Sequence, residues 1–147
     1  MEKSLSVSIT SISGSYKNLV LYLQNASLAT AGEIRFTINS LTNPYGYSYA
    51  SNGALSTSGT SGVAFGYLGN FPAYQDSTSV TLTIPNYAMT SSRPHWIMFG
   101  GQYPSNGSPM AVFSWGALNN GVAVTSLQLF PGAGNFSTGT YYLYGVN

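Results

Sequence analysis

Apolar and polar residues alternate with a period of two along most of the chain. Leu5, Val7 and Ile9, for example, alternate with serine. Side chains of a β-strand point alternately to its two faces, so this period is typical of strands with one buried face. The pattern predicts strands within residues 5–9, 19–23, 34–38, 45–49, 63–67, 80–84, 96–99, 110–115, 122–130 and 140–146.

The stretches between these runs are rich in Gly, Pro, Asn and Ser. About ten short strands separated by such turns predict an all-β fold, a single-domain antiparallel β-sandwich that is jelly-roll-like. The best helical candidate, Ala26–Gly32, is short. Ser51–Gly62 is low in complexity and is interpreted as a mobile loop, because strand patterns lie on both sides. We expect residues 1–147 to form one domain, since domains of roughly 100–150 residues are the most common.

Charged residues make up only 5% of the chain, against about 25% in an ordinary soluble domain. The seven are Glu2, Lys3, Lys17, Glu33, Arg35, Asp76 and Arg93. The surface must therefore consist largely of Ser, Thr, Asn, Gly and Tyr, which give almost no long-range repulsion between copies. Such a chain is expected to self-associate, and it suits a subunit that is held in a large assembly.

The same composition argues against several partners and compartments. A net charge of +1 with four basic residues is too little for the phosphate contacts of a nucleic-acid-binding protein. No run of 18 apolar residues is present, so we expect no membrane span. Residues 1–7 lack the apolar core of a secretory signal, which favours synthesis in a cytoplasm. Without cysteine there is no disulfide framework and no thiolate metal site.

Candidate catalytic groups are few. His95 and Asp76 are the only base and orienting carboxylate available for a serine triad, and no G-x-S-x-G motif accompanies them. Glu33 and Asp76 could meet as a glycosidase pair, but Glu33 is better explained as a partner of Arg35 or of a neighbouring strand. Residues 132–134 are glycine-rich, yet the Lys and helix of a phosphate loop are missing, so a hairpin turn is favoured. We therefore predict no catalytic residue, cofactor or metal.

The C-terminal segment carries a motif. Residues 132–146 read GAGNFSTGTYYLYGV, which resembles the closing hairpin of a family of tailed-phage virion proteins, G-x-F-x-x-G-(S/T)-x-x-L-Y-G-(I/V/L). Val7–Leu23 resembles the opening segment of that family, and Val80–Ala88, with its I-P-N-Y, resembles one of its strand ends. The three matches are in family order and are spread along the chain from residue 7 to residue 146. The chain departs from the family in having few Arg residues in its second strand region.

The resemblance implies a virion structural protein, of the minor structural, capsid-decorating or tail-associated kind. Our first hypothesis is a cement protein on the outer surface of the head. Its partners would be the major capsid protein and copies of itself, with a trimer favoured. The alternative is a tail-tip or tail-fibre protein that binds host glycan, and a hydrolase comes third. Candidate interface residues are aromatic, although such rings are more often buried: Tyr45, Tyr47, Tyr49, Trp96 and Trp115.

The closing motif also has a physical interpretation. Leu127 and Leu129 are assigned to one strand, and Leu143 and Val146 to the strand that returns beside it. The ring of Phe136, in the turn, would close the end of the sandwich. We expect Leu127, Leu129, Phe136 and Leu143 in the core. Two glycines mark a bulge or a close approach that leaves no room for a side chain: Gly139 and Gly145.

Overall fold

The computed structural model describes residues 6–30, 32–40, 45–51, 54–63, 66–71, 78–102, 110–118 and 121–147, and for residues 33, 45–71, 102, 110 and 112 its backbone alone. The described residues form eleven β-strands and no helix. The strands are β1 (Val7–Ile9), β2 (Asn18–Leu28), β3 (Gly32–Ile38), β4 (Tyr45–Ser51), β5 (Ala54–Val63), β6 (Gly66–Phe71), β7 (Thr78–Pro85), β8 (His95–Gln102), β9 (Met110–Ala117), β10 (Leu127–Pro131) and β11 (Phe136–Val146).

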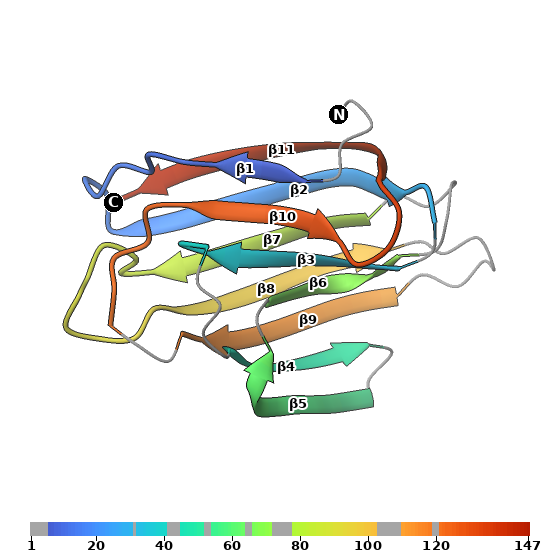
Figure 1. Cartoon of the computed structure of the whole chain (residues 1–147), viewed down its shortest axis with the longest axis horizontal. Coiled ribbons are helices and arrows are strands. Elements are labelled where there is room, and N and C mark those ends of the chain that lie inside the picture. The colour runs from blue at the N-terminus through green and yellow to red at the C-terminus, as the bar shows by residue number, and fades with distance from the viewer. Residues whose placement is uncertain are drawn as a thin grey trace.

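The strands form two antiparallel sheets that pack face to face (Figure 1). The smaller sheet, in front in Figure 1, has the order β1-β10-β3-β6, and the larger sheet has the order β11-β2-β7-β8-β9-β4-β5. The predicted β-sandwich is therefore confirmed. Jelly-roll connectivity stays a prediction.

The core lies between the two sheets and is built by the alternation seen in the sequence. Phe36 on β3 meets Trp96 on β8 edge to face, with ring centroids 5.2 Å apart and planes at 83°. Such a contact joins the two sheets and adds to the free energy gained by burying apolar surface. The buried side chains of the central strands are Leu19, Leu21, Leu23, Ile34, Phe36, Ile38, Val80, Leu82, Ile84, Trp96, Met98, Leu127 and Leu129.

The predicted closing hairpin is wrong. β10 lies between β1 and β3 in the smaller sheet, whereas β11 pairs with β2 at the edge of the larger sheet. Residues 132–135 therefore cross from one sheet to the other. Alternation along a strand shows which face is buried but not which strand lies beside it, and this is why the pairing could not be predicted.

The expected core residues of this segment are confirmed despite the different pairing. Leu127, Leu129 and Phe136 are buried, and Leu143 packs against the core from a partly buried position. Phe136 is not in a turn, because it is the first residue of β11 and its ring lies fully inside the sandwich.

Both glycines of the motif have the predicted roles. Gly139 has φ 132° and lies at the second register shift of β11, between Thr138 and Thr140, as expected of a bulge. A Cβ atom on Gly145 would collide with the ring of Tyr16, whose Cε2 atom would be 2.7 Å away. The close approach of Tyr16 to β11 therefore requires glycine at position 145.

Three other segments differ from the predictions. Ser51 ends β4 and Ala54–Val63 forms β5, so Ser51–Gly62 is strand rather than mobile loop over its described residues. Ala26–Gly32 is not helical, because it contains the end of β2 and the start of β3. Residues 121–126 precede β10 without strand structure. In the first two segments, pairing with neighbouring strands determined the structure, rather than local composition.

Side-chain hydrogen bonds hold the irregular segment before β10. The Asn39 amide nitrogen donates to the Ala123 carbonyl oxygen at 2.7 Å. The Asn39 Oδ1 atom accepts from the backbone N–H groups of Thr125 at 2.7 Å and Ser126 at 3.1 Å. Backbone hydrogen bonds also hold the segment, including one from the Val124 N–H to the Tyr87 carbonyl oxygen at 2.8 Å. Together these bonds satisfy groups that a strand ladder would have paired, and they fix the point where the chain enters β10.

Candidate functional site

Two rows of side chains run across the outward side of the larger sheet. Cross-strand pairing places the residues of each row opposite one another on β11, β2, β7, β8 and β9. The first row is Tyr144, Val20, Thr83, Ile97 and Trp115, and the second is Tyr142, Tyr22, Thr81, Phe99 and Phe113. We call the surface formed by these ten residues the outer face.

One half of the outer face is an apolar patch, which consists of Ile97, Phe99, Phe113 and Trp115 on β8 and β9. Ile97 lies opposite Trp115 and Phe99 lies opposite Phe113. Phe99 is 64% exposed and Trp115 is 51% exposed. Directly opposed side chains on one sheet face are in contact distance, so the four form one continuous apolar surface open to solvent.

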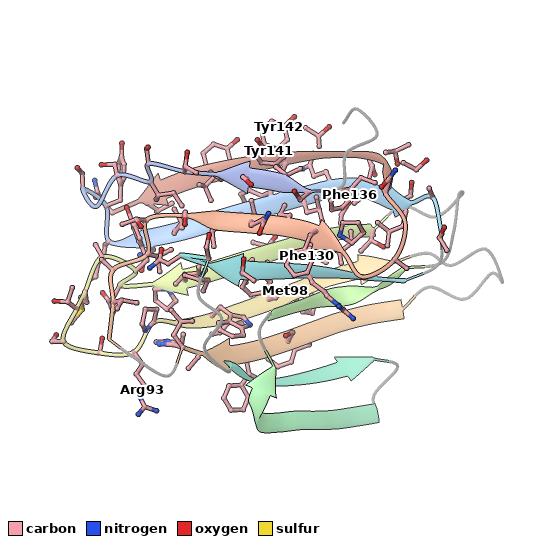
Figure 2. All side chains as sticks on the ribbon, viewed as in Figure 1. Arg93, Met98, Phe130, Phe136, Tyr141 and Tyr142 are labelled. Atoms are coloured by element: carbon pink, nitrogen blue, oxygen red, sulfur yellow. The ribbon has the colours of Figure 1, made fainter. Side chains whose placement is uncertain are left out.

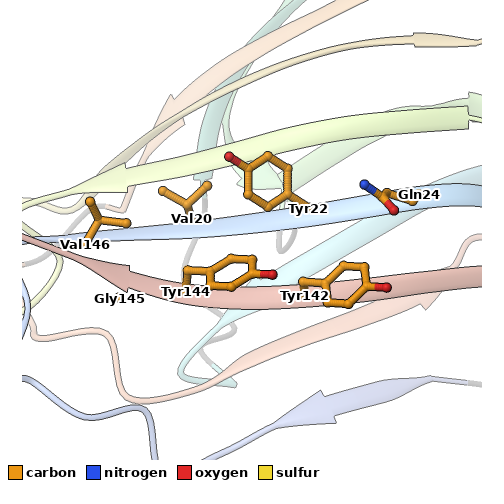
Figure 3. Close-up of a pocket in the computed structure, with 7 residues that line it drawn as sticks. All are labelled: Val20, Tyr22, Gln24, Tyr142, Tyr144, Gly145 and Val146. Atoms are coloured by element: carbon orange, nitrogen blue, oxygen red, sulfur yellow. The ribbon is translucent and has the colours of Figure 1, made fainter.

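The other half contains an open hollow over β2 and β11, which we call the tyrosine hollow (Figure 3). Its volume is about 640 Å³. The rings of Tyr142 and Tyr144 are nearly parallel, with centroids 6.4 Å apart and planes at 19°. Tyr22 meets Tyr144 edge to face at 5.8 Å. The lining residues are Val20, Tyr22, Gln24, Tyr142, Tyr144, Gly145 and Val146.

The outer face carries no formal charge among its described residues. The sequences of β2, β7, β8, β9 and β11 contain no Asp, Glu, Lys or Arg. Lys17 precedes β2, Arg35 is on the smaller sheet, and Arg93 projects from the loop between β7 and β8 (Figure 2). Recognition at this face must therefore rest on apolar contact and uncharged hydrogen bonds.

The structure separates the five interface candidates named from the sequence. Trp115 is exposed on the apolar patch. Trp96 is fully buried against Phe36, so its assignment as an interface residue is corrected. The cause is strand alternation, which turns Trp96 inward and its neighbour Ile97 outward. Tyr45, Tyr47 and Tyr49 lie on β4 beside β9, but their side chains are outside the described part of the structure.

Sequence reasoning missed most of the outer face. It did not single out Phe99, Tyr22, Tyr142 or Tyr144 as exposed contact residues. A signal was present in β2, where three inward leucines alternate with Val20 and Tyr22, so that both faces of the strand are apolar. A strand that is apolar on both faces indicates a second covered surface.

The structure describes the side chain of one candidate catalytic group, His95. The His95 side chain is exposed at the start of β8. Asp76 and the side chain of Glu33 lie outside the described residues. Within the described ranges, no cluster of three or more His, Cys, Asp or Glu could hold a metal ion, and no helix is long and apolar enough to cross a membrane.

No family model, curated protein or solved structure matches the chain. The function of the outer face must therefore be inferred from its own geometry and chemistry.

Proposed function

We propose that this chain is a non-enzymatic virion structural protein that binds the outer surface of a phage head and stabilises the shell. The observation that carries the proposal is the apolar patch on an uncharged sheet face. The resemblance of residues 132–146 to the end of a virion-protein family supports the same conclusion. The major capsid protein is the proposed partner.

The apolar patch has the composition of a protein interface. Contiguous exposed apolar surface is uncommon on monomeric soluble proteins and marks sites of association. Trp is among the residues that contribute most to binding free energy, and aromatic rings are enriched at interface centres, where charged residues are depleted. Phe99 and Trp115 are exposed aromatic residues on strands without charged residues, and Trp115 is also of the type that contributes most to binding. Covering them would remove two large rings from water, which is the main favourable term in protein association.

A shell is a suitable partner for a face of this shape. Side chains on a sheet stand in regular rows, so the outer face presents a broad surface rather than a deep cleft. Copies of this protein carry too little charge to repel one another, and binding to a closed symmetric assembly would keep them apart. We propose that the protein acts as a homo-oligomer there, with a trimer favoured, and that its place is the virion exterior after synthesis in the host cytoplasm.

A reconstruction of the native particle tests the location. We expect density for a two-sheet sandwich on the shell, with the apolar patch turned toward the capsid protein. Density at the tail tip instead would reject decoration and support the alternative of a tail-associated protein that binds glycan.

Substitutions on the outer face test the mode of binding. Trp115→Ser and Phe99→Ser should each reduce occupancy on purified particles at least about tenfold, which corresponds to ~1.4 kcal/mol. Tyr142→Ser, on the same face but outside the apolar patch, is the matched control and should keep occupancy within about twofold, or ~0.4 kcal/mol. Equal losses for the three variants would argue against the patch as the contact.

A further inference from the structure

We propose that the tyrosine hollow is a binding site for an uncharged sugar. This inference goes beyond the proposed function and does not depend on the attachment of the chain to a particle. It rests on four properties of the hollow: the arrangement of its rings, its polar atoms, its lack of charge and its shape.

The rings form a platform suited to the apolar face of a pyranose. Tyr142 and Tyr144 are two residues apart and therefore lie on the same side of β11, and Figure 3 shows both rings lying along the strand in the same direction. The edge of one ring in the pair Tyr22–Tyr144 meets the face of the other, which holds the platform in place without a ligand. Aromatic faces carry negative charge density, and the C–H groups of a sugar ring are weakly positive, so the two surfaces attract.

Polar atoms surround the platform. Each of the three rings carries a phenolic hydroxyl group, which both donates and accepts hydrogen bonds, and Gln24 adds an amide with a donor and an acceptor. A sugar has the same combination of apolar ring faces and hydroxyl edges. A purely apolar ligand would leave these groups unpaired on binding, which is unfavourable for any group that the ligand buries.

The lack of charge selects among sugars. The seven lining residues include no Asp, Glu, Lys or Arg. A carboxylated or sulfated sugar would lose water around its charge without gaining an ion pair or a charge-assisted hydrogen bond. The hollow is therefore matched to neutral hexoses rather than to sialylated or sulfated glycans.

The shape favours a chain over a free monosaccharide. The hollow is open to solvent at the sheet edge, because β11 ends the larger sheet and, among the described strands, pairs there with β2 alone. Val20 and Val146 lie toward one end of it and Gln24 toward the other (Figure 3). Successive sugar units could lie along β11 with one unit over each ring, which agrees with the 6.4 Å spacing of Tyr142 and Tyr144.

Isothermal titration calorimetry with the full chain tests the site. The probes are maltohexaose and cellohexaose as neutral chains, sialyllactose as an anionic sugar, and a decaproline peptide as an extended ligand of another class. We expect at least one neutral chain to bind and the other two probes to show no heat of binding. Tyr144→Ala should weaken that binding about tenfold or more, or ~1.4 kcal/mol.

Three further variants make the result specific. Tyr144→Phe retains the stacking ring and should lose less affinity than Tyr144→Ala, and Tyr142→Ala should resemble Tyr144→Ala. Phe99→Ala, on the same face outside the hollow, should bind as the parent does. Thermal melts verify that each variant is folded. If the alanine variants do not fold, the sugar affinity of Tyr144→Phe is the test of the site.

The proposal is overturned if neither neutral chain binds, if decaproline or sialyllactose binds more tightly, or if the tyrosine variants retain full affinity. Its failure is distinguishable from failure of the proposed function, because particle occupancy is tested at Trp115 and Phe99 and sugar affinity at Tyr142 and Tyr144.

Discussion

The two halves of the outer face share one sheet but are built from different rings. The tyrosine hollow has three rings, and each bears a hydroxyl group, whereas the apolar patch has Ile97, Phe99, Phe113 and Trp115. A tyrosine ring can stay in water because its hydroxyl group remains hydrated. A phenylalanine ring has no such group. The tyrosine half therefore suits a site that is often empty, and the other half suits a surface that is covered in the assembled state.

The two halves also differ in what lies behind them. Trp96 and Met98 fill the core behind the apolar patch. Behind the hollow, β11 is an edge strand whose largest buried anchor is Phe136. The exposed rings thus rest on the interior strands β8 and β9 in one half, and on the edge strand β11 and its interior neighbour β2 in the other. Substitutions behind each half can show whether the two surfaces depend on one another.

The largest effect is expected for Phe136→Ala. The ring is fully buried, so its removal should lower the free energy of unfolding by about 3–5 kcal/mol. Urea denaturation measures the loss. The matched control is Phe99→Ala, which removes the same ring from an exposed site and should cost less than about 1 kcal/mol. Equal losses would mean that Phe136 does not anchor β11.

Gly100→Ala tests the junction between the halves, where β7 pairs with β8. A Cβ atom at this position would collide with the Ser79 carbonyl oxygen and would lie 2.6 Å from the Val80 Cα atom. Because backbone has to move, we expect a loss of about 1–3 kcal/mol in the free energy of unfolding. Gly101→Ala, one residue on and exposed, is the control and should change the melting temperature little. A Gly100→Ala variant as stable as the parent would show that β7 and β8 can shift to admit the Cβ atom without a loss of stability.

In the purified protein no capsid protein is present to cover the apolar patch, so copies should associate through it, and self-association should distinguish the halves. The double variant Phe99→Ser, Trp115→Ser removes the rings that gain most from being covered. We expect its apparent association constant in sedimentation experiments to fall at least about tenfold, or ~1.4 kcal/mol. The double variant Tyr142→Ser, Tyr144→Ser should associate as the parent does. If the tyrosine double variant lost association and the Phe99, Trp115 double variant did not, the covered surface would lie over β11.

Salt should have a smaller effect on either half. The outer face has no formal charge among its described residues, and surface charges elsewhere are screened beyond a Debye length of ~8 Å at physiological ionic strength. Occupancy on particles should therefore change less than about twofold, or ~0.4 kcal/mol, between low and moderate salt. Release of the protein in moderate salt at neutral pH would show that ion pairs hold it.

The smallest effect is expected for His95→Ala. The side chain is exposed at the first residue of β8, so the free energy of unfolding should stay within about 0.5 kcal/mol of the parent. Particle occupancy and sugar affinity should also be retained. A hydrolytic activity in the purified parent protein that this variant loses would instead support the third hypothesis, an enzyme.

Most of the sandwich could be predicted because strand alternation is a local property. Leu19, Leu21 and Leu23 indicate their buried face without reference to any other strand. The partners of a strand are not local. The register that places Leu129 beside Phe36, and Leu143 beside Leu21, depends on the crossing of residues 132–135 between sheets. The predicted hairpin was wrong for this reason.

The site could be predicted only in part. Trp115 was named because tryptophan is conspicuous in a sequence, and the same criterion led to the buried Trp96. The rows of the outer face exist only once five strands are placed in register, so Tyr22 and Tyr142 become neighbours through pairing alone. Alternation could still have ranked Trp115 above Trp96, since Trp96 shares its face with Met98 of the core.

The pairing of β1 with β10 and of β2 with β11 has a consequence for how the protein is made. Each sheet joins a strand from the first part of the chain to one from the last part. Such contacts close long loops and slow folding. On the ribosome, β2 must wait for β11 while the chain elongates at about 5–20 residues per second. During that interval its leucines are exposed, with no charge in the strand to deter a neighbouring chain. The yield of soluble protein should therefore rise when expression is weak and few nascent chains are present at one time.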